Sequence, residues 1–247
     1  MTATGAGHPA NPLPANPLIV AVDTDDLAEA IAVARTLDGV AGHIKVGHLL
    51  FGAHGPAAVR ELGKYAPVFL DLKLHDIPSV VARAARTYAA LGVAMLTVHA
   101  GGGAAMVAAA VEGMAAGAPA ASPAPMVLAV TVLTSLSDQD LSAMNVPPAA
   151  VQTPHLAAQA VAAGAPGVVC APWDVRGVRA AVGSDPVVVT PGVRPSGSPT
   201  DEHARAATPA EALAAGATHL VVGRPITGSH DPVAAARAIL AAASWPR

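Results

Sequence analysis

The residues best suited to chemistry in this 247-residue chain stand in the run Asp71-Leu72-Lys73-Leu74-His75-Asp76. Side chains alternate along a strand, so Asp71 and Lys73 would share its inner face while Leu72 and Leu74 share the outer face. A carboxylate and an ammonium side by side keep each other charged at neutral pH. Asp71 would disfavour a substrate carboxylate bound beside it, and Lys73 would protonate the carbanion that loss of CO2 leaves. These residues predict a decarboxylation that requires neither a metal nor an organic cofactor.

Two further charges are expected in the same region. Lys45 lies on the inner face of the preceding predicted strand, and Asp76 follows Lys73 in a turn held by Ile77-Pro78. Lysine can give up a proton whereas arginine does not, and two of the chain's three lysines are Lys45 and Lys73. A purely structural ion-pair network is the alternative. We disfavour it because charges inside parallel strands are costly to bury and cluster at functional sites.

Two other polar residues leave more than one interpretation open, and a third is expected to have no role. Asp23 ends the first predicted strand, where it would either bind a ligand or cap the next helix. His99 ends the fourth predicted strand and would either take part in chemistry or only form hydrogen bonds. His75 falls on the outer face of its strand, and we expect no chemistry from it.

Short apolar strands alternating with Ala-rich helices must position these residues. We expect eight strands, at residues 18–23, 43–47, 68–74, 95–100, 126–133, 167–171, 187–191 and 219–223. The expected helices lie near residues 25–37, 50–64, 79–91, 103–116, 153–163, 174–182, 209–215 and 232–243. This alternation predicts the α/β class and a single (β/α)8 TIM barrel. An open doubly wound sheet is the alternative, but no G-x-G-x-x-G motif follows the first strand. We expect a disordered lead over residues 1–16 and one catalytic domain over residues 17–247.

The loops after the last two strands have the character of a phosphate site. TIM barrels often bind phosphate there, and these loops carry Arg194, Gly223 and Arg224. Arginine forks and close-approach glycines suit a phosphate dianion, although arginines exposed to solvent are the alternative. The long polar stretch over residues 194–207 is a candidate lid.

Composition argues against several other classes of protein. Hydrophobic residues make up 53% of the chain and charged residues 13%, which excludes a disordered chain. No apolar run reaches the roughly 18 residues of a membrane-spanning helix. The net charge of −3 and 2% aromatic content argue against a nucleic-acid partner. The single cysteine, Cys170, fits a reducing compartment, so we expect a cytoplasmic protein with no membrane partner.

Six segments of the chain resemble the orotidine 5′-phosphate decarboxylase family, whose members convert orotidine monophosphate to UMP. They occur in order from about residue 18 to 230, and the D-x-K-x-H-D-I-P stretch is the most specific. The matching segments are Ile44-Lys45-Val46-Gly47, Asp71-Leu72-Lys73-Leu74-His75-Asp76-Ile77-Pro78, Leu96-Thr97-Val98-His99-Ala100, Val130-Thr131-Val132-Leu133-Thr134-Ser135, Thr190-Pro191-Gly192-Val193-Arg194 and Val222-Gly223-Arg224-Pro225-Ile226-Thr227.

The resemblance implies a role for each matching charge. Lys73 would be the proton donor, and Lys45, Asp71 and Asp76 would complete a charged array without a metal or other cofactor. The family supplies the last aspartate across a dimer interface, which implies a homodimer in which Asp76 serves the partner's site.

The resemblance also implies the contacts with the substrate. The ribose would be bound by Asp23 and Lys45, the pyrimidine by Thr134, and the phosphate by Arg194, Gly223 and Arg224. The family usually has a further glutamine at the phosphate, and counting back from Thr208-Pro209 puts His203 at that position.

Two rival functions fit part of this pattern. Sugar-phosphate decarboxylases or aldolases of the 3-keto-gulonate 6-phosphate type share the Asp-x-Lys-x-x-Asp core but use Mg2+. They carry an acidic residue in place of Lys45, and a lysine repels a metal. The other rival, a non-catalytic nucleotide-binding barrel, would not need four alternating charges in one mouth.

Overall fold

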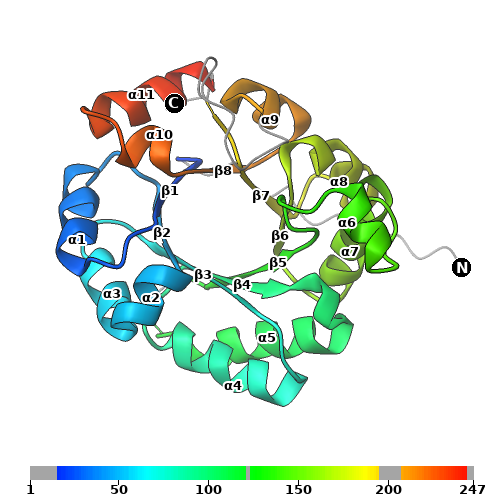
Figure 1. The fold of residues 1–247 in the computed structure, drawn as a ribbon. Coiled ribbons are helices and arrows are strands. Elements are labelled where there is room, and N and C mark those ends of the chain that lie inside the picture. The colour runs from blue at the N-terminus through cyan, green and yellow to red at the C-terminus, as the bar shows by residue number, and fades with distance from the viewer. Residues whose placement is uncertain (1–15, 121–122, 195–206, 244–247) are drawn as a thin grey trace, which may run out of the picture.

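The computed structural model describes residues 16–120, 123–194 and 207–243. Its eight parallel strands form a closed barrel in which each strand pairs with the next and β8 pairs with β1. Figure 1 looks down the barrel, with the strands around the centre and the helices outside them. The predicted TIM barrel is therefore confirmed. The expected boundary between residues 16 and 17 stays a prediction, because residues 1–15 lie outside the described ranges.

The strands agree with the predicted positions and mostly end earlier. They are β1 (Leu18–Val22), β2 (His43–Gly47), β3 (Val68–Leu74), β4 (Met95–His99), β5 (Met126–Val130), β6 (Gly167–Val169), β7 (Val187–Pro191) and β8 (His219–Val222). The largest difference is at β5, which was predicted to reach residue 133. The chain leaves the strand after Val130, and Leu133 and Thr134 line the cavity described below.

The helices differ from the prediction in number and in length. They are α1 (Leu27–Thr36), α2 (His48–His54), α3 (Pro56–Leu62), α4 (Pro78–Ala89), α5 (Ala104–Gly117), α6 (Asp138–Ala143), α7 (Ala149–Ala162), α8 (Val175–Val182), α9 (Pro209–Ala215), α10 (Arg224–Thr227) and α11 (Pro232–Ala242), with 3-10 turns at Ala100–Gly102 and Pro172–Asp174. The single helix expected at residues 50–64 is two helices. Gly55 adopts a positive φ of 53° that ends α2, and Pro56 then begins α3.

Apolar side chains fill two layers, one inside the barrel and one between strands and helices. In β1, Ile19 and Ala21 belong to the inner cluster, while Leu18, Val20 and Val22 belong to the outer one. Phe69 is among the largest fully buried side chains and belongs to the inner layer. This packed floor closes the barrel interior and leaves the carboxyl ends of the strands as the place for a site. No helix in the described ranges is long and apolar enough to cross a membrane.

Strand β3 departs from regular geometry near its end. Its outer residues pack as expected, since Leu70 is in the outer cluster and Leu72 and Leu74 pack against that cluster. The pairing with β4 shifts register between Leu70 and Leu74, and Lys73 has a φ of +49°. The prediction that Asp71 and Lys73 face inward and Leu72 and Leu74 outward is thus confirmed. The strand is irregular at these residues, however, and is not the regular pleat on which the prediction was based.

Candidate active site

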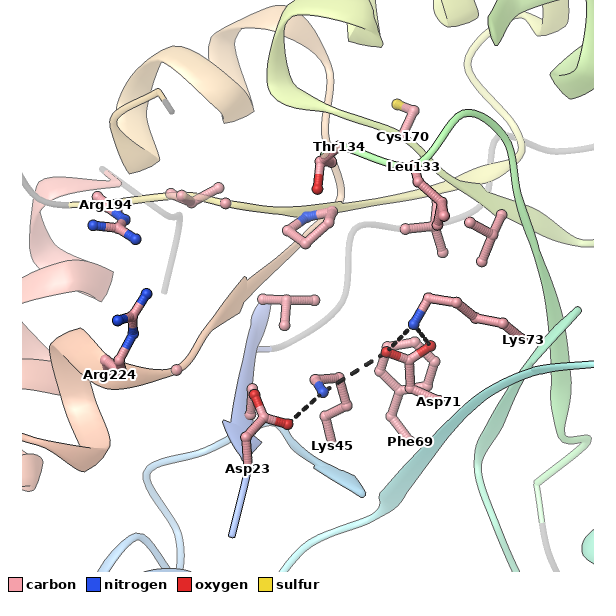
Figure 2. A pocket seen from close by; sticks show the side chains of 18 of the residues that line it. Asp23, Lys45, Phe69, Asp71, Lys73, Leu133, Thr134, Cys170, Arg194 and Arg224 are labelled. Carbon is pink, nitrogen blue, oxygen red and sulfur yellow. Dashed lines mark hydrogen bonds and ion pairs between the residues drawn. The ribbon is translucent and has the colours of Figure 1, made fainter. Parts of the chain in front are cut away.

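A cavity of about 260 Å³ opens at the carboxyl ends of the barrel strands (Figure 2). Charged residues line one part of it, and the loops after β7 and β8 line another. Its polar and charged lining residues are Asp23, Lys45, Asp71, Lys73, Thr134, Arg194 and Arg224, with Gly192 and Gly223 between them. Phe69, Val130 and Val169 form part of the apolar lining below. One concave site therefore collects most of the residues predicted from the sequence.

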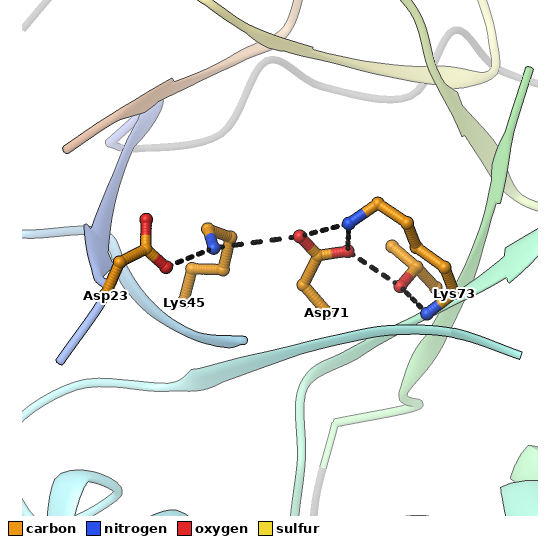
Figure 3. Close-up of polar contacts among 5 residues, drawn as sticks. Asp23, Lys45, Asp71 and Lys73 are labelled. Carbon is orange, nitrogen blue, oxygen red and sulfur yellow. Dashed lines mark hydrogen bonds and ion pairs between the residues drawn. The ribbon is translucent and has the colours of Figure 1, made fainter. Parts of the chain in front are cut away.

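Four charges of alternating sign form a row across this cavity (Figure 3). Lys45 Nζ lies 3.0 Å from Asp23 Oδ1 and 3.7 Å from Asp71 Oδ2. Lys73 Nζ donates to both carboxylate oxygens of Asp71, each at 2.9 Å. The row comes from three neighbouring strands, because Asp23 follows β1, Lys45 lies in β2, and Asp71 and Lys73 lie in β3.

The middle of the row is shielded from solvent and its ends are open. The exposed fraction of the side chain is 14% for Asp71 and 12% for Lys45, against 62% for Asp23. Burial by itself would raise the pKa of Asp71. The charges of Lys45 and Lys73, with hydrogen bonds from Lys73 and Thr97, outweigh burial and hold that pKa below its ordinary value. Asp71 is therefore a carboxylate at neutral pH, fixed in direction by its donors.

Two arginines stand apart from this row in the same cavity. Arg194 follows β7 and Arg224 begins α10, directly after Gly223. Figure 2 shows their guanidinium groups near one another, on the far side of the cavity from Lys73. This arrangement suits a ligand with an anionic group at one end and a reacting group at the other.

Comparison with known proteins agrees with this geometry. The model of the orotidine 5′-phosphate decarboxylase / HUMPS family matches residues 16–239. The chain belongs to this family. An orotidine 5′-phosphate decarboxylase of Anaeromyxobacter sp. (strain K) is 53% identical over 231 residues, 92% of this chain and 98% of the relative. One from Moorella thermoacetica is 50% identical over 228 residues, 91% of this chain and 90% of the relative. The crystal structure of orotidine 5′-phosphate decarboxylase from Lactobacillus acidophilus superposes with a TM-score of 0.84 at 39% identity, covering 93% of this chain and all of that one.

In this family member, Asp76 lies apart from the row that it was predicted to join. It is exposed, it is not among the residues that line the cavity, and its Oδ1 accepts the backbone N–H of Ile77 at 2.6 Å. The cavity of a single chain thus contains two lysines and two aspartates without Asp76. His203, the predicted replacement for a phosphate-binding glutamine, lies outside the described residues, as does most of the candidate lid.

The two histidines near the row pack against each other. The rings of His75 and His99 lie 5.3 Å apart, and neither residue lines the cavity. Burial, followed by the charges of His75 and Lys73, lowers the pKa of His99. His99 is therefore neutral at pH 7, which favours the interpretation that it forms contacts at the barrel mouth.

The sequence by itself predicts no role for one residue of the site. Thr97 of β4 is fully buried, and its hydroxyl donates to Asp71 Oδ1 at 2.9 Å. The hydroxyl oxygen of Thr97 also accepts the backbone N–H of Lys73 at 2.8 Å. Strand alternation places Thr97 on the inner face with Met95 and His99, and this polar residue between Leu96 and Val98 was the available signal.

The position of Lys45 in the row bears on whether a divalent cation could bind there. Lys45 Nζ occupies the space between the carboxylates of Asp23 and Asp71, where a divalent cation would have to lie. Gly47 leaves room for it, since a Cβ at that position would be 3.1 Å from Lys45 Nζ. Within residues 16–120, 123–194 and 207–243, no group of three or more His, Cys, Asp or Glu is arranged to hold a metal.

Proposed function

We infer that this protein decarboxylates orotidine 5′-monophosphate to UMP and CO2 in pyrimidine biosynthesis. Relatives that carry the name of this activity match more than nine-tenths of the chain at 50% identity or more. The observation that carries the inference is the Asp–Lys–Asp–Lys row, which ends at a lysine held by an ionised aspartate. No bound metal or coenzyme has a part in the steps below.

We propose that the substrate spans the cavity. Arg194 and Arg224, with the backbone at Gly223, hold the phosphate, and Thr134 contacts the pyrimidine. The ribose hydroxyls lie against Asp23 and Lys45, where the 62% exposed carboxylate of Asp23 is open to accept a hydrogen bond. Binding energy from the phosphate contacts then holds the reacting end of the substrate beside Asp71, although its carboxylate is repelled there.

The chemical step follows from Asp71 and Lys73, the neighbouring charges at one end of the row. The carboxylate of the substrate lies beside the carboxylate of Asp71, and their repulsion is relieved when the bond from C6 to the carboxylate breaks. CO2 leaves, and the electron pair stays on C6 as a carbanion. Lys73 stabilises this charge and transfers a proton from Nζ to C6. Its side chain is 28% exposed, so water can restore the proton after each turnover.

A metal-dependent sugar-phosphate reaction on the same barrel is the nearest rival. The test is to follow the loss of orotidine 5′-monophosphate absorbance in buffer with EDTA, with 3-keto-gulonate 6-phosphate plus Mg2+ as the comparison substrate. We expect full turnover of the nucleotide in EDTA and none of the sugar phosphate. Turnover of the nucleotide only after Mg2+ is added, or none at all, would contradict the proposed function.

We further propose that two copies form a homodimer in which Asp76 enters the partner's cavity. Its exposure outside its own cavity supports this, as does the neighbouring Ile77, a large apolar side chain that is 63% exposed. The lone cysteine, Cys170, is buried and free, which supports our expectation that the protein acts in the cytoplasm.

Mixing two inactive variants tests the shared site. A dimer of one Lys73→Ala chain and one Asp76→Ala chain would have one site with both defects and one intact site. Subunit exchange at equal amounts would then restore activity to about a quarter of all sites, because half of the dimers are mixed. No recovery after exchange is verified would mean that Asp76 serves its own chain.

A further inference from the structure

The break in the pairing of β3 with β4 lies at the catalytic pair. Leu70 is paired with Leu96 and Leu74 with Val98, so three residues of β3 stand opposite Thr97 alone. Two of those three are Asp71 and Lys73. Within this break the backbone N–H of Lys73 donates to the side-chain oxygen of Thr97 in β4 at 2.8 Å.

The backbone at Lys73 is in a conformation that lysine rarely adopts. Its φ of +49° lies in the left-handed region, which costs free energy for any residue with a Cβ. Such a conformation persists only where the surroundings hold it in place. The hydrogen bond to Thr97 is a restraint of this kind, because it engages the N–H of the strained residue itself.

The hydroxyl of Thr97 has one proton, and the geometry assigns that proton to Asp71. Because the oxygen already accepts from Lys73, its own hydrogen is directed to Asp71 Oδ1 at 2.9 Å. A fully buried side chain thus joins the backbone of one member of the charged row to the carboxylate of another. Lys73 Nζ in turn binds both oxygens of that carboxylate, which closes the network.

We propose that Thr97 is a positioning residue for the decarboxylation: its hydroxyl holds Lys73 in the left-handed conformation and fixes the direction of the Asp71 carboxylate. This inference rests on the proposed function, because it assigns Thr97 to the alignment of the proton donor and the repelling carboxylate. The residue does not line the cavity, so it acts through its two neighbours and not on the substrate.

Two substitutions separate the hydroxyl from the shape of the side chain. Thr97→Val keeps the shape and removes both hydrogen bonds, while Thr97→Ser keeps the hydroxyl. A hydrogen bond to a charged group is worth enough that its loss lowers kcat by about 10–100-fold. We expect this loss in Thr97→Val with the KM changed less than about 3-fold, since the phosphate contacts are intact, and we expect recovery of most of kcat in Thr97→Ser.

Thr218→Val is the matched control. Thr218 directly precedes β8, and its hydroxyl accepts the N–H of Val188 in β7 at 3.0 Å and lies within hydrogen-bond distance of the Val188 carbonyl (3.1 Å) and of His219 Nδ1 (3.0 Å), all at the amino ends of the strands. We expect kcat within about 2-fold of that of the protein without substitutions. Thr218→Val leaves a backbone N–H without its acceptor, as Thr97→Val does, but this N–H lies away from the charged row.

The pH profile gives a readout that a merely structural role would not change. The hydrogen bond from Thr97 lowers the pKa of Asp71, so its removal raises that pKa and moves the acidic limb of kcat to higher pH. The other charged or titratable groups that face Asp71 are Lys45, Lys73 and His99, and all variants retain them.

The possible outcomes separate this inference from the proposed function. If the protein without substitutions does not turn over orotidine 5′-monophosphate, the proposed function is contradicted before any variant is compared. An active protein whose Thr97→Val variant keeps the original kcat and pH profile overturns only the role of Thr97. If the valine variant does not fold, Thr97→Ser and Thr97→Ala decide the question: kcat in serine at least tenfold above alanine supports the role, and equal values overturn it.

Discussion

The two ends of the barrel both bury titratable side chains, and they do so in opposite ways. At the carboxyl ends of the strands, Asp71 is buried between Lys45 and Lys73 and stays ionised. At the amino ends, the rings of His43 and His219 meet edge to face with centroids 5.8 Å apart. Among the described residues, Nδ1 of His43 has no hydrogen-bond partner.

The pKa values record the difference between the ends. Burial lowers the pKa of His43 to about 4, and burial together with His43 lowers that of His219 to about 3. Without an opposite charge nearby, a buried group gives up its charge. With an opposite charge on each side, a buried group keeps its own charge, which is then available for chemistry. In this barrel, the end where a buried charge has oppositely charged neighbours is the end that carries the chemistry. The end where buried histidines lack such neighbours only supports the fold.

Loss of the proton donor is the strongest test of the charged end. We expect Lys73→Ala to lower kcat by at least about 10²–10⁴-fold, the range attributed to general acid catalysis, while UMP still binds. The control is Lys64→Ala, since Lys64 is 59% exposed and forms an ion pair with Glu61 in α3. Single-turnover kinetics and a UMP titration measure the two effects. A substantial residual rate in Lys73→Ala would mean that another group donates the proton.

Acid should weaken the fold through the histidine end. The folded pKa values of His43 and His219 lie below the unfolded value of about 6.5, so the unfolded chain binds more protons between pH 6.5 and 4. Their contribution is complete above pH 6.5 and is lost as the pH falls. Each histidine costs about 1.4 kcal/mol per pH unit in that window, so we expect the free energy of unfolding to fall by about 2–4 kcal/mol between pH 6.5 and 5.

Urea unfolding of His43→Phe at both pH values measures this loss. The variant keeps a ring beside His219 and removes one titrating group, so we expect a smaller difference between pH 6.5 and 5. His155→Phe, at an exposed position of α7, should retain the full difference. If His43→Phe and His155→Phe respond to acid alike, the histidine pair is not the source.

The phosphate side of the charged end is tested by Arg224→Ala. We expect kcat/KM for orotidine 5′-monophosphate to fall about 10–100-fold, because a charge-assisted contact with the dianion is lost. Orotidine without its phosphate should be affected far less. The control is Arg237→Ala on the exposed side of α11. An equal loss for both substrates would place Arg224 away from the phosphate.

The smallest expected effect concerns the room around Lys45. In Gly47→Ala, the new Cβ would be 3.1 Å from Lys45 Nζ and 3.3 Å from Asp23 Oδ1, so the end of the lysine must shift by a few tenths of an ångström. We expect a loss of a few-fold in kcat/KM, since one ion pair is displaced and not removed. Gly52→Ala in α2, where a Cβ meets nothing within 4 Å, should leave the rate unchanged. A rate in Gly47→Ala equal to that of Gly52→Ala would show that the row tolerates the shift.

Local patterns in the sequence determined the barrel and the composition of its mouth. Alternation of apolar runs with helical stretches predicts eight parallel strands, and the period of two along each strand predicts that Asp71 and Lys73 point inward. Both patterns depend on neighbours in the chain, so they are visible without the fold. The placement of Asp23, Thr134, Arg194 and Arg224 in one cavity follows from the same rule that strand ends meet at one face.

Only the tertiary structure decided the features that depend on one strand's register against another. One is the break in pairing opposite Thr97, where Lys73 has its positive φ. Another is the contact of His43 with His219, which joins residues from different strands. The exclusion of Asp76 from its own cavity likewise depends on how the turn after β3 leaves the barrel. Such contacts follow from the closure of the whole barrel, whose geometry no single segment contains.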